Sequence, residues 1–281
     1  MPTTTDGKTR TRKKLVWTVS AIAFAVLVTS CATPYTPPTG GGGAVVPTGA
    51  ARNGNWSKLI FRDDFDNGTG KWQRNWRMGN DTSVSPPANK SWEAACWNPA
   101  NTFTRNGELV MRAESKPCTD AFGRTYASTT GGASTGSWNF TYGYVEARIF
   151  LPADGSGKIA NFPAFWVNGV PNDSGAWPRG GEIDVIEGLE SHVSCWHYHW
   201  GSGQAAGGCP PVSPVAGWHT YGVAWEPGSL KFYYDGNLVA THTSGVVSNP
   251  MYIALDNAVP STWARTLPAE MRVDYVRVWQ H

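Results

Sequence analysis

Short segments in which apolar and polar residues alternate recur along most of this chain. In the clearest of them, residues 144–151, one face carries Val, Ala, Ile and Leu and the other carries Tyr, Glu, Arg and Phe. A period of two residues is typical of a half-buried β-strand. The same pattern predicts eight further strands, at residues 59–61, 108–112, 164–167, 183–186, 221–225, 231–234, 251–255 and 272–279.

Turn-forming residues separate most of these segments, and no stretch has the periodicity of an amphipathic helix of several turns. Asp235-Gly236, for example, suits a tight hairpin between two strands. Many short strands without helices predict an all-β fold, either a sandwich or a barrel. Residues 53–281, roughly 230 in number, fit one all-β domain better than two half-size ones.

The first 30 residues have the order of an export signal. Five basic residues and one acidic residue fall within residues 1–14, and a mostly apolar run follows from Leu15 to Val28. As a helix, the apolar run from Leu15 to Val28 would span about 21 Å, which is shorter than the roughly 30 Å hydrocarbon core of a bilayer. An export signal is therefore favoured over a permanent transmembrane helix.

The end of this run, Val-Thr-Ser-Cys at residues 28–31, resembles the bacterial lipobox, whose cysteine is lipidated and becomes the new N-terminus. The alternative is ordinary signal cleavage near Ala32. Residues 31–52 are rich in Pro and Gly and predict a flexible tether, as a membrane-anchored protein would need. The resemblance implies an exported lipoprotein that meets the membrane only through Cys31.

Five cysteines are an odd number for an exported protein, and lipidation of Cys31 would leave four that can pair. Three pairings are formally possible. Closeness in sequence favours Cys96–Cys118 and Cys195–Cys209, in an oxidising compartment where such bridges persist. A zinc site is disfavoured because no Cys-x-x-Cys pair is present.

Composition narrows the possible partners. Removal of residues 1–30 leaves 18 basic and 20 acidic residues, a net charge of −2, so nothing recommends a nucleic acid or an acidic lipid surface. Fourteen tryptophans remain, more than a core of this size requires. Because indole rings stack on the C–H faces of sugars, some are expected to bind carbohydrate, while core packing accounts for many others. No oligomerisation signal is evident, and a monomer is expected.

The sharpest chemical signal is an apolar strand that contains three carboxylates, Glu182, Asp184 and Glu187. Like charges at close range raise one another's pKa, so stability alone gives no reason to gather them. A solvated acidic edge is disfavoured, because the three aliphatic residues among them require a buried opposite face. The cluster therefore indicates function.

Strand geometry makes a specific demand on this motif. Side chains alternate along a strand, so Glu182 and Asp184 share a face while Glu187 should point to the other. A β-bulge at Val185-Ile186 would bury both aliphatic side chains and return Glu187 to the face of Glu182.

Two glutamates on one face of a cleft suit glycoside hydrolysis, in which one carboxylate attacks the anomeric carbon and the other protonates the leaving oxygen. Retention of configuration requires carboxyl groups about 5 to 5.5 Å apart, and inversion about 6.5 to 9.5 Å. Asp184 is expected to hydrogen-bond Glu182 and to help keep Glu187 protonated. Catalysis of this kind needs no cofactor.

This motif resembles that of glycoside hydrolase family 16, in the bulged form Glu-Ile-Asp-aliphatic-aliphatic-Glu of its laminarinases and galactan-cutting members. Further similar segments stand at residues 61–66, 163–166, 177–178, 219–225, 234–236 and 273–278. The resemblance implies a jelly-roll sandwich of two curved antiparallel sheets, whose concave face forms the substrate cleft.

The resemblance also implies roles for single residues. Glu182 is the expected nucleophile, Asp184 the assisting carboxylate and Glu187 the acid/base. The expected substrate contacts are Trp166, Trp177 and His199, or His197 if the strand phase is shifted, with Trp97, Trp200 and Arg148 as further candidates. For each tryptophan, core packing is the alternative role.

Some members of the family hold a structural calcium ion on the convex side. Here its ligands would be Asp66 or Asp64, the carbonyl of Gly107, and Asp274. Oxygen-only ligation suits calcium. The alternative is that Asp274 only hydrogen-bonds nearby backbone.

Two segments, residues 188–190 and 255–260, depart from the laminarinase pattern, and both are expected to border the cleft. The expected activity is that of a retaining endo-glycosidase on β-1,3- or mixed β-1,3/1,4-glucan. A red-algal galactan (an agarase- or carrageenase-like activity), transglycosylation, and a non-catalytic glucan-binding protein remain as alternatives. The presence of both glutamates argues against the last of these.

Overall fold

The computed structural model describes residues 45–66, 75–78, 93–120, 122–170, 177–189, 194–213 and 215–281. The chain divides into two compact units, Met1–Thr33 and Pro34–His281, and every described residue belongs to the second. The export signal, Cys31 and the tether up to residue 44 lie outside the described residues, so these predictions stay predictions.

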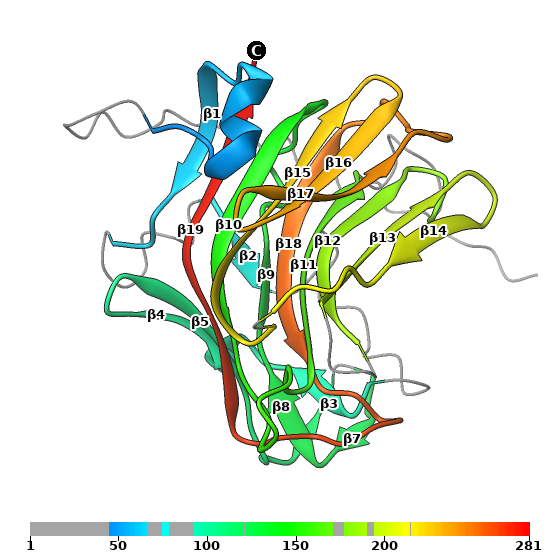
Figure 1. The fold of residues 1–281 in the computed structure, drawn as a ribbon. Helices are drawn as coiled ribbons and strands as arrows, with labels where there is room; N and C mark the ends of the chain where they lie inside the picture. Colours follow the sequence, from blue (N-terminus) through cyan, green and yellow to red (C-terminus); the bar gives the residue numbers. More distant parts are fainter. Residues whose placement is uncertain are drawn as a thin grey trace, which may run out of the picture. The chain divides into compact units, whose positions relative to one another are not determined.

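Two antiparallel sheets form the domain (Figure 1). Sheet A has eight strands, in the order β17 (Asn237–His242), β16 (Ser229–Tyr234), β15 (Gly217–Glu226), β10 (Gly143–Leu151), β19 (Ala269–Gln280), β5 (Glu108–Ala113) and β4 (Thr102–Arg105), with β1 (Lys58–Asp63) also paired to β19. Sheet B has seven, in the order β14 (Gln204–Gly208), β13 (Ser194–Trp200), β12 (Glu182–Gly188), β11 (Phe162–Gly169), β18 (Met251–Ala258), β9 (Gly132–Ser134) and β2 (Arg77–Met78).

Two small sheets complete the described part. Strand β3 (Ala95–Trp97) pairs in parallel with β8 (Ser128–Thr130), and β6 (Cys118–Thr119) pairs with β7 (Thr125–Tyr126). Short 3-10 helices stand at η1 (Gly49–Gly54) and η3 (Pro99–Asn101). Within the described ranges no α-helix occurs, and so no helix there is long and apolar enough to span a membrane.

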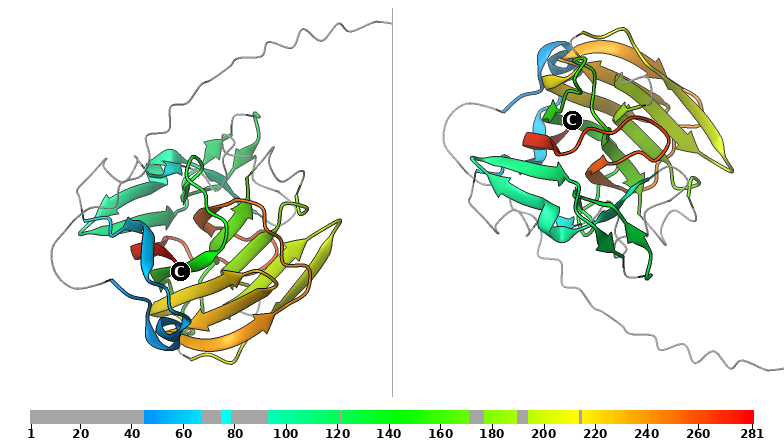
Figure 2. Two further views of the ribbon diagram at one scale, coloured as in Figure 1. Left: turned by 90° about the horizontal axis from the view of Figure 1, so that it is seen from above. Right: turned by 90° about the horizontal axis from the view of Figure 1, so that it is seen from below.

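The apolar core lies between the two sheets, which appear as two layers when the domain is viewed end-on (Figure 2). Val145 and Ile149 of sheet A and Phe165, Ile183 and Leu255 of sheet B all belong to one cluster of buried side chains. Each sheet therefore turns one face to this core and one face outward, as expected for a sandwich. The outer face of sheet B carries the site described below.

All nine strands expected from the alternation of apolar and polar residues are present, so the all-β sandwich prediction is confirmed. The tight hairpin is also present: Tyr234 pairs with Asn237, and Asp235 and Gly236 both have positive φ, at 46° and 71°. Positive φ at both central residues is the requirement of the favoured two-residue hairpin turn. Strand β13 was not among the predicted segments, because its run Trp-His-Tyr-His-Trp is aromatic throughout, which obscures the alternation.

The end of the predicted tether is packed against the domain. The indole N–H of Trp279 donates to the carbonyl of Val45 (2.9 Å), and Ala51 is buried beside Trp56. Val45 and Ala51, which the sequence assigned to the tether, therefore contact the domain. Small residues such as Ala51, which lies within η1, pack closely against the domain, and a count of large apolar residues overlooks them.

Both predicted disulfides are present, Cys96–Cys118 and Cys195–Cys209. The first joins β3 to β6, and the second joins β13 to the segment that follows β14. The second bridge therefore secures two strands of sheet B beside the acidic motif.

Candidate active site

Strand β12 has a β-bulge in the middle of the acidic motif. Along β11, Asp184 pairs with Trp166 and Ile186 pairs with the adjacent Phe165, which leaves Val185 as the extra residue. The register against β13 shifts over the same stretch, between Asp184 and Glu187. The predicted bulge is confirmed.

The bulge places all three carboxylates on the outer face of sheet B. Val185 and Ile186 are both buried in the core, with 6% and 0% of their surface exposed, so Glu187 turns outward again. Glu182 and Glu187 each have a carboxylate oxygen within 4.8 Å of one on Asp184. An unbulged strand would have sent Glu187 into the core.

The three carboxylates border one pocket with a volume of about 250 Å³. Its other lining residues come from β11, β18 and the segment before β12: Phe162, Ala164, Trp166, Trp177, Asp256 and Ala258. Acidic groups thus meet an apolar and aromatic wall in one depression. Such a wall suits a sugar ring, which combines an apolar C–H face with polar edges.

Trp166 and Trp177 both line this pocket. Trp166 donates its indole N–H to Asp256 (3.3 Å), which orients the ring along β11. Trp177 is 62% exposed and hydrogen-bonds Glu182 through its side chain. An exposed indole beside a carboxylate is available for stacking on a ligand, because no core residue covers most of its surface.

Two histidines of β13 contact the carboxylates. His199 Nε2 lies 3.5 Å from Asp184 Oδ2, and its ring centroid is 5.6 Å from that of Trp177. His197 Nδ1 makes a close contact with Glu187 Oε2. The structure thus brings both alternatives, His199 and His197, to the cluster, because they are two residues apart on one strand face.

The pKa values of the carboxylates reflect their burial and crowding. Burial raises the pKa of Glu182 to about 7, the charge of Glu187 adds to the rise, and the hydrogen bond from Trp177 opposes it. Burial, followed by repulsion from Glu187 and Glu182, raises the pKa of Asp184 well above its usual range. Burial also lowers the pKa of His199, so this imidazole is neutral at pH 7. The cluster therefore retains protons near neutral pH.

Asp256 of β18 belongs to the site although the motif analysis did not assign it a role. Its pKa is raised well above the usual range by burial and then by repulsion from Glu93, with a further contribution from Glu187. The residue lies in the segment 255–260 that departs from the laminarinase pattern. That departure was the available signal, since a carboxylate here adds a fourth acid to the pocket.

The remaining substrate-contact predictions divide. Trp97 of β3 lies on the outer face of sheet B, where a Cβ built on Gly132 would come within 3.2 Å of its ring and of Asp256. Trp200 does not face the pocket: it stacks on buried Tyr198, with ring centroids 4.9 Å apart, on the opposite face of β13 from the histidines. Alternation along the strand is the cause.

Arg148 is also absent from the pocket. It belongs to β10 of sheet A, where Val145, Ala147 and Ile149 turn to the core and Arg148 turns outward. Its guanidinium pairs with Asp274 (3.0 Å) and lies over the ring of Trp218, 4.5 Å from the centroid. The predicted substrate contact by Arg148 was wrong, because the polar face of a strand in sheet A is on the far side of the sandwich.

The expected calcium ligands have other partners. Asp64 is held by Arg62 and Arg277, and Asp274 pairs with Arg148. A carboxylate between two guanidinium groups does not fit a bound cation, so the version of the site that uses Asp64 is not supported. Asp66, the alternative ligand, is exposed at a turn, and that version stays a prediction.

The chain belongs to family 16 of the glycosyl hydrolases: the family described as "Glycosyl hydrolases family 16" matches residues 89–277. A keratan-sulfate endo-1,4-beta-galactosidase from Sphingobacterium multivorum is 29% identical, over an alignment that covers 79% of this chain and 55% of the relative. An endo-1,3-1,4-beta-glycanase from Rhizobium meliloti is 32% identical, over an alignment that covers 64% of this chain and 40% of the relative. This chain thus spans about half, or less, of the length of these relatives.

Among solved structures, an endo-beta-1,3-glucanase from Pyrococcus furiosus is 29% identical and superposes with a TM-score of 0.66, over 79% of this chain and 94% of that one. The sandwich found here is therefore the fold of the family.

Proposed function

We propose that this chain is a retaining, endo-acting glycoside hydrolase that cleaves β-1,3- or mixed β-1,3/1,4-glucan. The observation that carries the proposal is the bulge at Val185-Ile186, through which Glu182 and Glu187 border one pocket from a single strand. Glu182 and Glu187 stand on either side of Asp184, in a pocket that Trp166 and Trp177 also line. Double displacement requires such a pair of carboxyl groups, one as nucleophile and one as acid/base.

In the proposed reaction, Glu182 attacks the anomeric carbon while Glu187 gives its proton to the glycosidic oxygen. The bond between that carbon and that oxygen breaks, which leaves a covalent glycosyl-enzyme and releases the other part of the glucan. Water then attacks the same carbon, Glu187 takes a proton from it, and Glu182 leaves as a carboxylate. Two inversions at one carbon give net retention.

Neighbouring residues support these roles. Burial raises the pKa of Asp184 well above its usual range, which favours a proton on this carboxylate. His197 fixes the Glu187 carboxylate through its contact with Oε2. Trp177, hydrogen-bonded to Glu182, presents its exposed ring to one sugar unit.

The substrate proposal rests on the relatives and on the pocket. Relatives are described as acting on mixed β-1,3/1,4-linkages and, in the solved structure, on β-1,3-glucan. The keratan-sulfate relative keeps a galactan as the second candidate. Initial rates of reducing-end release from laminarin, lichenan, agarose, carrageenan and keratan sulfate would decide, and laminarin or lichenan is expected to be cut fastest.

Three variants test the catalytic roles: Glu182→Gln, Glu187→Gln and, as a matched control, Glu226→Gln on β15 of sheet A. We expect each of the first two to lose at least about 10³-fold in kcat on laminarin, since a nucleophile or general acid is removed. The control should match the wild type. Equal hydrolysis by wild type and Glu182→Gln would reject the assignment, and early appearance of the inverted anomer by NMR would reject retention.

The export of this chain as a monomeric lipoprotein is a further part of the proposal. Its support is the lipobox-like sequence at Cys31 and two disulfides, which form in oxidising compartments. Labelling with a fatty-acid analogue should mark the wild type and not Cys31→Ser. Labelling of both chains would place the lipid elsewhere, and labelling of neither would favour ordinary cleavage near Ala32.

A further inference from the structure

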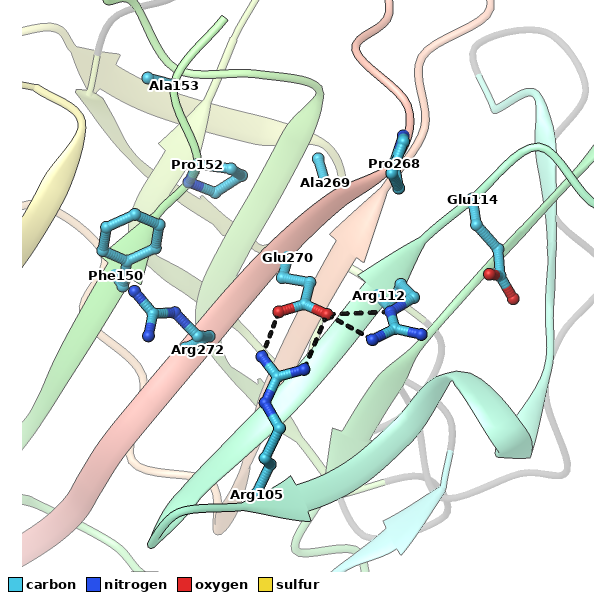
Figure 3. Close-up of a pocket in the computed structure, with 10 residues that line it drawn as sticks. All are labelled: Arg105, Arg112, Glu114, Phe150, Pro152, Ala153, Pro268, Ala269, Glu270 and Arg272. Carbon is cyan, nitrogen blue, oxygen red and sulfur yellow. Dashed lines mark hydrogen bonds and ion pairs between the residues drawn. The ribbon is translucent and has the colours of Figure 1, made fainter.

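The outer face of sheet A has a cavity of its own (Figure 3). It lies on the opposite side of the sandwich from the carboxylates, which belong to sheet B. Its volume is about 680 Å³, within the roughly 300 to 1,000 Å³ of small-molecule sites. The lining residues come from β4, β5, β10, β19 and their adjoining turns: Arg105, Arg112, Glu114, Phe150, Pro152, Ala153, Pro268, Ala269, Glu270 and Arg272. None of them takes part in the proposed hydrolysis.

Strand register gathers these side chains in two adjacent rows. Arg272 of β19 pairs with Phe150 of β10, and two residues earlier Glu270 pairs with Arg112 of β5. Residues 270 and 272 point outward because Met271 between them is buried in the core. The charged rows are thus a consequence of the same alternation that builds the core.

Glu270 lies between Arg105 and Arg112 (Figure 3). Glu270 Oε1 accepts from Arg105 Nη1 at 3.2 Å and from Arg112 Nε and Nη2 at 2.9 and 2.7 Å, while Oε2 pairs with Arg105 Nη2. One carboxylate therefore holds two guanidinium groups in place and neutralises only one of them. Their side chains remain 40% and 36% exposed, so a ligand can reach them.

Arg272 is fixed in a different way. Its guanidinium lies 4.1 Å from the Phe150 ring centroid and 5.1 Å from that of Trp218, and its Nη1 donates to Glu108 at 3.2 Å. Cation–π contacts of this kind hold a guanidinium flat against the ring. The third cation of the cavity is therefore also preorganised.

Donor groups remain after these contacts are counted. Within the described ranges, Arg105 Nε, Arg112 Nη1 and Arg272 Nε and Nη2 donate to no protein acceptor. Three arginines and two glutamates line the cavity, a third glutamate, Glu108, pairs with Arg272 from outside the lining, and Glu114 already accepts from Asn101 Nδ2 at 3.3 Å. A planar or tetrahedral oxyanion suits such donors, because guanidinium groups bind carboxylates and sulfates through paired hydrogen bonds.

We propose that this cavity binds an acidic saccharide, that is, a sugar oligomer that carries carboxylate or sulfate groups. The arginines bind the anionic group, and Phe150, Pro152 and Pro268 form an apolar wall for the C–H face of a sugar ring. The preference for an anion follows from the unused guanidinium donors, whereas its assignment to a saccharide rests on the proposed function. Such a site would hold the enzyme on an acidic polysaccharide while its cleft acts on neutral glucan.

Calorimetric titration of the full chain tests this site with three probes: trigalacturonate, a sulfated chondroitin disaccharide, and neutral laminaritriose. We expect an acidic probe to bind, more weakly as salt rises, and its binding to persist when laminaritriose fills the cleft. The double variant Arg105→Gln with Arg112→Gln should weaken that binding at least tenfold and leave laminarin hydrolysis unchanged. Lys231→Gln is the matched control, since Lys231 also pairs with a glutamate on sheet A, at 3.3 Å from Glu226.

The two acidic probes distinguish a carboxylate site from a sulfate site. Absence of binding by both at millimolar concentration, or full binding by the double variant, would overturn the proposal. If the double variant does not fold, Arg272→Gln serves in its place and is expected to lose the same binding. Glu182→Gln should still bind the acidic probe, so failure of the catalytic assignment and failure of this site would be seen separately.

Discussion

His197 Nδ1 contacts Glu187 Oε2 directly, so the proposed acid/base is held by a side chain from the neighbouring strand β13. We expect His197→Ala to lower kcat on laminarin about 10- to 100-fold, because a hydrogen bond to a charged partner contributes about 1.5 to 3 kcal/mol. His197→Asn, whose amide nitrogen can replace Nδ1, should recover part of this loss.

The control for this prediction is His219→Ala, which breaks a similar pair with Asp235 (2.8 Å) on sheet A. Its kcat should match that of the wild type even if its stability falls. A purely structural role for His197 would lower the stability of His197→Ala and leave kcat intact, and that result would contradict the prediction.

The position of the His197 ring depends on a glycine opposite it. Gly207 of β14 is its cross-strand partner, and a Cβ at Gly207 would lie 2.0 Å from His197 Cδ2. We therefore expect Gly207→Ala to displace the ring and reduce kcat, although Gly207 takes no part in the chemistry. The adjacent Gly208→Ala is the matched control, since its Cβ would meet nothing closer than 3.4 Å. Equal kcat for the two variants would show that the ring position does not matter.

The dependence of activity on pH should report Glu182. A nucleophile must be ionised, and the pKa of Glu182 is raised to about 7 by burial. We expect kcat/KM to fall as the pH drops through about 7, since this ratio follows groups of the free enzyme. A profile that stays flat down to pH 5 would contradict the raised pKa.

The same shift gives a prediction for stability. Because the folded-state pKa of Glu182 lies above its ordinary value of 4.5, folding favours the protonated form. The associated stability is fully present below pH 4.5 and is lost as the pH rises through about 7. Glu182→Gln should therefore unfold at a higher temperature than the wild type at pH 8, with the difference shrinking toward pH 4. A constant difference across this range would contradict the linkage.

The acidic motif shows how far a sequence can predict a site. The bulge followed from two demands that only it satisfies: burial of Val185 and Ile186, and a shared face for Glu182 and Glu187. Trp200 could have been excluded by the same reasoning, because one strand cannot turn both His199 and Trp200 to one face. Arg148 could not, since strand alternation gives a face but does not say to which sheet the strand belongs.

Asp256 shows a different limit. Its bond to Trp166 depends on the pairing of β18 with β11, which brings together residues about 90 positions apart. The departure from the family pattern indicated only that the segment borders the cleft. Long-range pairings of this kind are set by sheet topology and leave no local pattern in the sequence.

Asp256 also supplies a prediction. Asp256→Asn keeps an oxygen for the Trp166 indole, so we expect kcat/KM within a few-fold of the wild type, whereas Asp256→Ala removes that acceptor and should lose about tenfold. Asp256→Asn should also be more stable than the wild type at pH 8, because the raised pKa of the aspartate makes its ionisation unfavourable in the folded state. Equal losses for both variants would mean that the charge matters rather than the bond to Trp166.

The N-terminal segment of the domain is anchored by one buried carboxylate, Glu146, which is 1% exposed. Its oxygens accept from the backbone N–H and the hydroxyl of Thr48, both at 2.9 Å, and from the hydroxyls of Tyr144 and Tyr275 at 3.0 and 2.9 Å.

The substitution Glu146→Leu would leave these four donors of Thr48, Tyr144 and Tyr275 unpaired. We expect it to lower the free energy of unfolding by roughly 2 to 4 kcal/mol in urea titrations. Hydrogen exchange should accelerate first at residues 48–54, and kcat should not change, because Glu146 lies on sheet A. The half-buried Glu226→Gln, on the surface of sheet A, should change stability by less than about 0.5 kcal/mol. Unchanged exchange at residues 48–54 in Glu146→Leu would show that the segment is held by the packing of Ala51 and Trp56 instead.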